Sequence, residues 1–121
     1  MTQTTTNNVD QLRISWTAGS GYTGIAGNTI TYQVQYRTCA TPASNCTGWS
    51  SGTATDVMFD IPVNNLRDNM YYQARVRANG STIGGYSLFS AESLRYPVTI
   101  ADPNNTPSNR ADDTVTVGTG V

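Results

Sequence analysis

The feature that most constrains the fold is a strict alternation of apolar and polar residues. Residues 30–37 and residues 71–78 both place an aromatic or aliphatic side chain at every second position. A period of two residues puts these side chains on one face of a β-strand and the polar ones on the other. Shorter alternating runs at residues 12–16 and 57–63 predict two more half-buried strands. The chain is therefore expected to be all-β.

Turn-forming segments separate the alternating runs, and five or six short strands at this spacing predict an antiparallel two-sheet sandwich. Residues 17–28 are rich in Gly, Ser and Thr and are typical of a loop. Pro62 lies on the outward face of its run and lacks a backbone donor, so its strand should lie at an edge or be interrupted there. Residues 1–8 supply almost no apolar side chain, so a strand there would be weak or missing.

Composition excludes several function classes. The 121 residues carry a net charge of -1, and with seven basic residues against eight acidic ones there is no basic excess to indicate nucleic-acid binding. Histidine is absent, so no Ser–His–Asp or Cys–His arrangement can form, and two cysteines alone cannot hold zinc. No apolar run approaches the roughly 20 residues that span a membrane, and the first residues do not form a signal peptide. We expect no enzyme, no cofactor and no membrane insertion.

The ordered set of core positions resembles a fibronectin type III domain over about residues 9–96. The resemblance implies an immunoglobulin-like sandwich of about seven strands, with the first strand weak or missing here, in a domain covering residues 1–98. It also implies a tyrosine corner, in which the Tyr72 hydroxyl bonds back to the chain and Leu66 packs beneath it. The residues that carry it are Leu12-x-Ile-x-Trp16, Tyr32-x-Val-x-Tyr36, Trp49, Leu66 and Tyr72-x-Ala-x-Val-x-Ala78, with Trp16, Leu66 and Tyr72 as central core residues.

The two cysteines, Cys39 and Cys46, enclose a turn-prone hexapeptide between two predicted strands. We favour a structural disulfide over two free buried thiols. Such a bond indicates an oxidising environment, which means an extracellular, cell-surface, periplasmic or virion location. The spacing is not the Cys-x-x-Cys of redox enzymes, which disfavours a redox role.

A candidate recognition face follows from the family's strand order, which makes the outward residues of the runs at 30–37 and 71–78 neighbours. Tyr86 and Phe89 lie in a segment that resembles the aromatic-Ser-x-aromatic-Ser box of some cytokine-receptor domains, where rings and arginines stack. A solvated sheet face is the favoured alternative. The face comprises Gln33, Gln35, Arg37, Gln73, Arg75 and Arg77.

The C-terminal residues 99–121 divide into a polar linker and a strand-like run in which Val115 and Val117 share a face. The run resembles the opening strand of repeats in bacterial surface proteins. It would then start a following module, or else fill an exposed sheet edge of its own domain or of a neighbouring copy. Three carboxylates, Asp102, Asp112 and Asp113, are weak calcium candidates, and a solvated linker is favoured.

These features predict a non-catalytic structural, adhesion or spacer module of a larger microbial or phage surface or secreted protein. One alternative is a self-assembling filament or virion subunit that exchanges its C-terminal strand. Another is an accessory module of a secreted polysaccharide-degrading enzyme, for which Tyr22, Trp49 and Tyr71 are the candidate carbohydrate-stacking residues. The expected partners are neighbouring domains, other copies of the chain, or a protein or glycan ligand.

Overall fold

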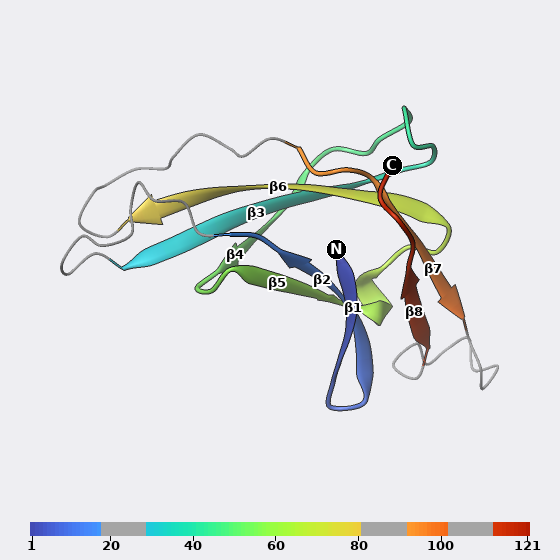
Figure 1. The fold of residues 1–121 in the computed structure, drawn as a ribbon, viewed down its shortest axis with the longest axis horizontal. Helices are drawn as coiled ribbons and strands as arrows, with labels where there is room; N and C mark the ends of the chain where they lie inside the picture. The colour runs from blue at the N-terminus through green and yellow to red at the C-terminus, as the bar shows by residue number, and fades with distance from the viewer. Residues whose placement is uncertain (18–28, 81–91, 102–112) are drawn as a thin grey trace.

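The computed structural model describes residues 1–17, 29–80, 92–101 and 113–121 (Figure 1). The elements in these residues are β1 (Thr2–Thr6), β2 (Val9–Ser15), β3 (Ile30–Cys39), β4 (Ser50–Ala54), β5 (Met58–Pro62), the 3-10 helix η1 (Val63–Asn65), β6 (Met70–Gly80), β7 (Tyr96–Ala101) and β8 (Thr114–Val117). They form one antiparallel sheet in the order β1-β2-β5 and a second in the order β4-β3-β6-β7-β8. The predicted all-β, two-sheet class is confirmed.

The longest pairing joins β3 to β6, and it forms where the alternation in the sequence is strictest. Ten residues of β3 face ten of β6 in antiparallel register, from Ile30 opposite Gly80 to Cys39 opposite Tyr71. Val34 is fully buried, whereas the polar residues on either side of it, Gln33 and Gln35, are only half-buried. The period of two therefore separates a core face from an outward face, as the sequence predicts.

The first strand is present, so the expectation that it would be weak or missing needs correction. All five residues of β1 pair with β2, from Thr2 opposite Arg13 to Thr6 opposite Val9. The turn between them places both Asn7 and Asn8 at positive φ, 52° and 64°. Two residues at positive φ match the right-handed twist of a hairpin, and asparagine tolerates that conformation. The strand forms through backbone pairing, because none of its side chains is fully buried.

The C-terminal run forms β8 and pairs with β7 of the same sheet, from Val98 opposite Val117 to Ala101 opposite Thr114. The strand therefore extends an edge of its own domain, one of the alternatives left open by the sequence. The domain boundary predicted at residue 98 falls inside β7, which continues to Ala101. Val115 is only 3% exposed, so β8 contributes to the core.

Residues of both sheets form one hydrophobic core. Leu66 and Tyr72 are each 2% exposed, as expected of central core residues. Trp16 is only half-buried and lies at the margin of the core, with its ring edge-on to Tyr32 at 5.3 Å between centroids. Trp16 therefore packs against the core from its margin and is less central than predicted. The buried apolar residues of the described part of the chain are Leu12, Ile14, Tyr32, Val34, Cys39, Ala54, Ile61, Val63, Leu66, Tyr72, Ala74, Val98 and Val115.

The strand β5 lies at an edge of the three-stranded sheet and ends at Pro62, as the missing backbone donor of proline predicts. Its register against β2 is marked by a pair of opposite charges. Arg13 faces Asp60 and donates two hydrogen bonds to its carboxylate, at 2.9 and 3.0 Å. These hydrogen bonds raise the pKa of the Arg13 guanidinium.

Candidate functional site

The outward face of the five-stranded sheet carries a ladder of arginine–glutamine pairs across β3 and β6. In each pair the arginine lies directly opposite the glutamine, and its guanidinium donates to the glutamine carbonyl. Such cross-strand pairs contribute roughly 0.2–1 kcal/mol each. The structure therefore brings together all six residues of the predicted recognition face. The pairs are Arg37–Gln73 (2.8 and 3.0 Å), Arg75–Gln35 (2.8 Å) and Arg77–Gln33 (2.5 Å).

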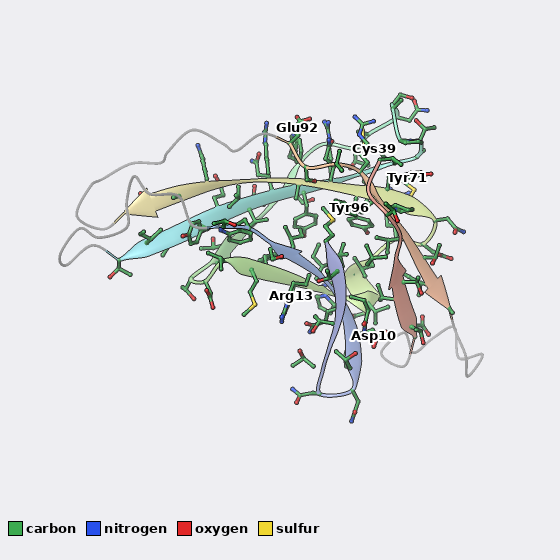
Figure 2. All side chains as sticks on the ribbon, in the orientation of Figure 1. Asp10, Arg13, Cys39, Tyr71, Glu92 and Tyr96 are labelled. Atoms are coloured by element: carbon green, nitrogen blue, oxygen red, sulfur yellow. A yellow bond between two sulfur atoms is a disulfide. The ribbon has the colours of Figure 1, made fainter. Side chains whose placement is uncertain are left out.

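Two residues of the ladder also form polar contacts with residues outside β3 and β6. Gln73 is only 6% exposed, and its side-chain amide donates to the Ser93 carbonyl at 2.9 Å. Arg37 approaches the carboxylate of Glu92 at 3.4 Å, and Figure 2 shows Glu92 on the outer side of this sheet. Much of the hydrogen-bonding capacity of this face is therefore used within the protein.

Trp49 covers part of the ladder from the segment just before β4. The guanidinium carbons of Arg37 and Arg75 each lie 4.3 Å from the centroid of its ring system, within cation–π range. Trp49 is half-buried and directly precedes the first residue of β4. The aromatic residues expected to stack there, Tyr86 and Phe89, lie outside the described residues, so their stacking stays a prediction.

The disulfide is formed, with 2.05 Å between the sulfur atoms of Cys39 and Cys46. Hydrogen bonds reinforce the loop that it closes. The Ala40 N–H donates to the Asn45 carbonyl at 3.0 Å, and Asn45 adopts a positive φ of 59°. The Thr47 N–H, immediately after the loop, donates to the backbone carbonyl of Thr38 at 2.8 Å. The segment after Cys46 is therefore held against the end of β3.

The hydroxyl of Tyr72 bonds back to the chain, as the resemblance implied. It accepts a hydrogen bond of 2.8 Å from the Arg67 N–H, five residues earlier. Leu66 is buried beside this contact, and its own N–H donates to the Val63 carbonyl at 3.1 Å. The turn between η1 and β6 is thereby held against the core, while Arg67 itself is exposed.

A pocket of about 310 Å³ opens between the disulfide segment and this tyrosine corner. Four separate segments line it: the end of β3, residues 47–50 up to the start of β4, the end of η1 with the turn after it, and the start of β6. Among the described residues, the lining comprises two arginines, several residues that carry a hydroxyl group, a glycine and an asparagine, and no acidic residue. The residues are Tyr36, Arg37, Thr38, Thr47, Gly48, Ser50, Asn65, Arg67 and Tyr72.

The sequence analysis placed Arg37 on the recognition face but did not predict this pocket. Asn65 ends η1 and Arg67 lies in the short turn that follows it. The sequence of this segment carries no periodic signal. Only the neighbouring Leu66–Tyr72 spacing indicated that this turn folds back onto β6. The pocket depends on contacts between distant segments, which a sequence pattern does not encode.

The remaining candidates are not assembled into a site in the part of the chain that the structure describes. No group of three or more His, Cys, Asp or Glu side chains lies close enough there to hold a metal ion. Asp113 is buried beside β8, while Asp102 and Asp112 lie outside the described residues. Of the carbohydrate-stacking candidates, Tyr71 is half-buried and Tyr22 lies outside the described residues. A search of the described residues found no helix with the length and apolarity of a membrane span.

Comparisons with known proteins do not identify the chain. No protein-family model matches the sequence, and no curated protein matches it.

Proposed function

We propose that the chain is a fibronectin type III-like module with a structural, spacer or adhesive role in a larger extracellular or surface protein of microbial or phage origin. The observation that carries the proposal is the hydrogen bond from the Arg67 N–H to the Tyr72 hydroxyl. The tyrosine lies in β6, the strand in which the resemblance requires a tyrosine corner. The adjacency of β3 and β6 is also what the family's strand order implies.

The disulfide supports an extracellular setting. Bonds such as Cys39–Cys46 persist in oxidising compartments and are rare in the cytosol. A non-catalytic role is supported by the absence of histidine from the sequence, because the most common general base is then missing. Fold alone does not determine function, so the proposal depends on a family analogy.

The position of β8 favours a module over a subunit that exchanges its C-terminal strand. The strand buries Val115 in the core of its own domain. The edge of β7 is already occupied by the chain's own β8 and therefore offers no site for the corresponding strand of a neighbour. An accessory carbohydrate-binding role would need a flat exposed aromatic platform, whereas Trp49 is half-buried against two guanidinium groups.

The solution mass of the chain tests this choice. We would compare the full chain with a version that ends at Ala101, using light scattering over a range of concentrations. The full chain should be monomeric, and the shorter version should be a less stable monomer because it lacks Val115. Oligomers of the full chain that disappear on truncation would instead make strand exchange the leading function.

A further inference from the structure

The pocket beside the disulfide has an unbalanced charge. Among the described residues that line it, two are arginines and none is acidic. Arg67 forms no ion pair with the acidic residues in the described part of the chain. Its guanidinium makes only a long contact, 3.5 Å, to the Thr38 hydroxyl. The other arginine, Arg37, has Glu92 as its ion-pair partner, at 3.4 Å, and that carboxylate does not line the pocket. The electrostatics favour an anionic occupant.

The rest of the lining indicates which anion fits. Thr38, Thr47, Ser50 and Asn65 offer hydroxyl and amide groups, which both donate and accept hydrogen bonds. The half-buried ring of Tyr36 adds an aromatic surface. A volume of about 310 Å³ is at the lower limit of small-molecule pockets. These groups suit a compact anion that also carries several hydroxyl groups.

Both walls of the pocket are held in place before any ligand arrives. The disulfide and the Thr47–Thr38 hydrogen bond hold one wall, and the Arg67–Tyr72 hydrogen bond holds the other. A site whose groups are already positioned loses less conformational entropy on binding. The backbone of Arg67 makes the structural contact, so its side chain remains available for a ligand.

We propose that this pocket binds a saccharide unit that carries a carboxylate, such as a hexuronic acid. The planar guanidinium of Arg67 matches a carboxylate with two parallel hydrogen bonds. The hydroxyl and amide groups of the lining bind the hydroxyl groups of the sugar ring. The inference depends on the pocket and not on the family assignment, and it goes beyond the proposed structural role by adding a ligand.

The first test is a calorimetric or NMR titration of the full chain with three matched probes. Glucuronic acid carries the carboxylate, its methyl ester keeps the hydroxyl groups without the charge, and glucose lacks the carboxyl group. Glucuronic acid should bind at least about tenfold more tightly than either neutral probe, because hydrogen bonds to a charged group are the stronger ones. Added salt should weaken its binding. Equal binding of the acid and its ester would overturn the proposal.

A pair of charge-matched variants locates the binding. Arg67→Gln keeps the backbone N–H that Tyr72 requires and removes the side-chain charge, so it should weaken glucuronic acid binding about tenfold. Arg77→Gln makes the same charge change on β6, at a residue outside the pocket lining, and it should leave the affinity within about twofold. Equal losses in both variants would show nonspecific attraction and would overturn the site.

A third variant tests the pocket without removing charge. A Cβ atom at Gly48 would meet no other atom within 4 Å, so Gly48→Leu should fold normally and fill part of the space. An unchanged melting temperature with reduced glucuronic acid binding supports the proposal. Unchanged binding in this variant, provided that it is folded, would overturn it.

Two further probes separate other anion sources. Glucose 6-sulfate carries a sulfate on a similar ring, and a short acidic peptide carries carboxylates without a sugar. Both should bind more weakly than glucuronic acid. Tighter binding of the sulfated sugar or of the peptide would overturn the assignment to a carboxylated saccharide, in favour of a sulfated glycan or of an acidic protein segment.

Discussion

Two of the edge strands, β1 and β8, are both rich in threonine, yet they are held in different ways. β1 has no fully buried side chain, whereas β8 buries Val115. A turn of two residues, Asn7 and Asn8, joins β1 to its partner, while residues 102–113 separate β8 from β7. Closing a longer loop costs more chain entropy. A strand that follows a tight turn therefore needs only backbone pairing, whereas a distant one needs a buried anchor.

One side chain, Asp10, contacts both of these strands, and it is labelled in Figure 2. One carboxylate oxygen accepts a 2.9 Å hydrogen bond from the Thr5 hydroxyl of β1, and the other accepts one of 2.9 Å from the Val115 N–H of β8. The second contact occupies a backbone donor of an edge strand. Donors of this kind otherwise recruit strands from other molecules.

The largest effect should come from removing the buried anchor of β8. Val115→Asp places an unpaired charge in the core, close to Asp10, and should lower the free energy of unfolding by about 3–5 kcal/mol. The exposed neighbour provides a control, because Thr116→Asp adds the same charge to the same strand at an outward position. Urea denaturation measures both. Equal losses in the two variants would contradict the anchoring role of Val115.

An intermediate effect should come from Asp10→Ala. It removes the carboxylate that accepts hydrogen bonds from Thr5 of β1 and from Val115 of β8. We expect a loss of about 1.5–2 kcal/mol, with faster hydrogen exchange at the Val115 amide. Asp10→Asn keeps one carbonyl acceptor and should lose less. If the Val115 amide exchanges at the same rate in Asp10→Ala as in the unaltered protein, the contact contributes nothing to holding β8.

The smallest effect should come from the turn that holds β1. Asn8→Val places a β-branched residue at a φ of 64° and should lower stability by about 1 kcal/mol. Asn8→Gly has no such steric penalty and should preserve stability. Amide exchange monitored by NMR should show loss of protection in β1 and unchanged protection in β8. Matching behaviour of the valine and glycine variants would exclude the turn as the element that holds β1.

The same contrast explains which parts of the fold could be predicted. Alternation identified β3 and β6 because their buried residues, such as Val34 and Ala74, recur at the period of a strand. β1 was expected to be weak or missing because Thr2–Thr6 contains no apolar residue, and the signal lay instead in the two asparagines that follow. The burial of Val115 was not predictable, because the alternation of its run did not say which edge it would join.

Only part of the candidate site could likewise be predicted from the sequence. The disulfide and the arginine–glutamine face were predicted, because one follows from a short spacing and the other from the pairing of two recognisable strands. The pocket was not predicted, because Arg67 and Thr47 approach each other only through the fold. Sequence patterns report which face a side chain occupies, and they do not report how separate loops converge.

The contact between Trp49 and Arg37 has an optical consequence. The indole ring lies 4.3 Å from the guanidinium carbon of Arg37, a residue that also lines the pocket, so its emission depends on where that cation sits. The chain has one other tryptophan, Trp16, at the margin of the core and outside the pocket lining. A Trp16→Phe variant would therefore carry a single tryptophan, near the pocket, and occupancy could be followed by selective excitation of that tryptophan without any attached label.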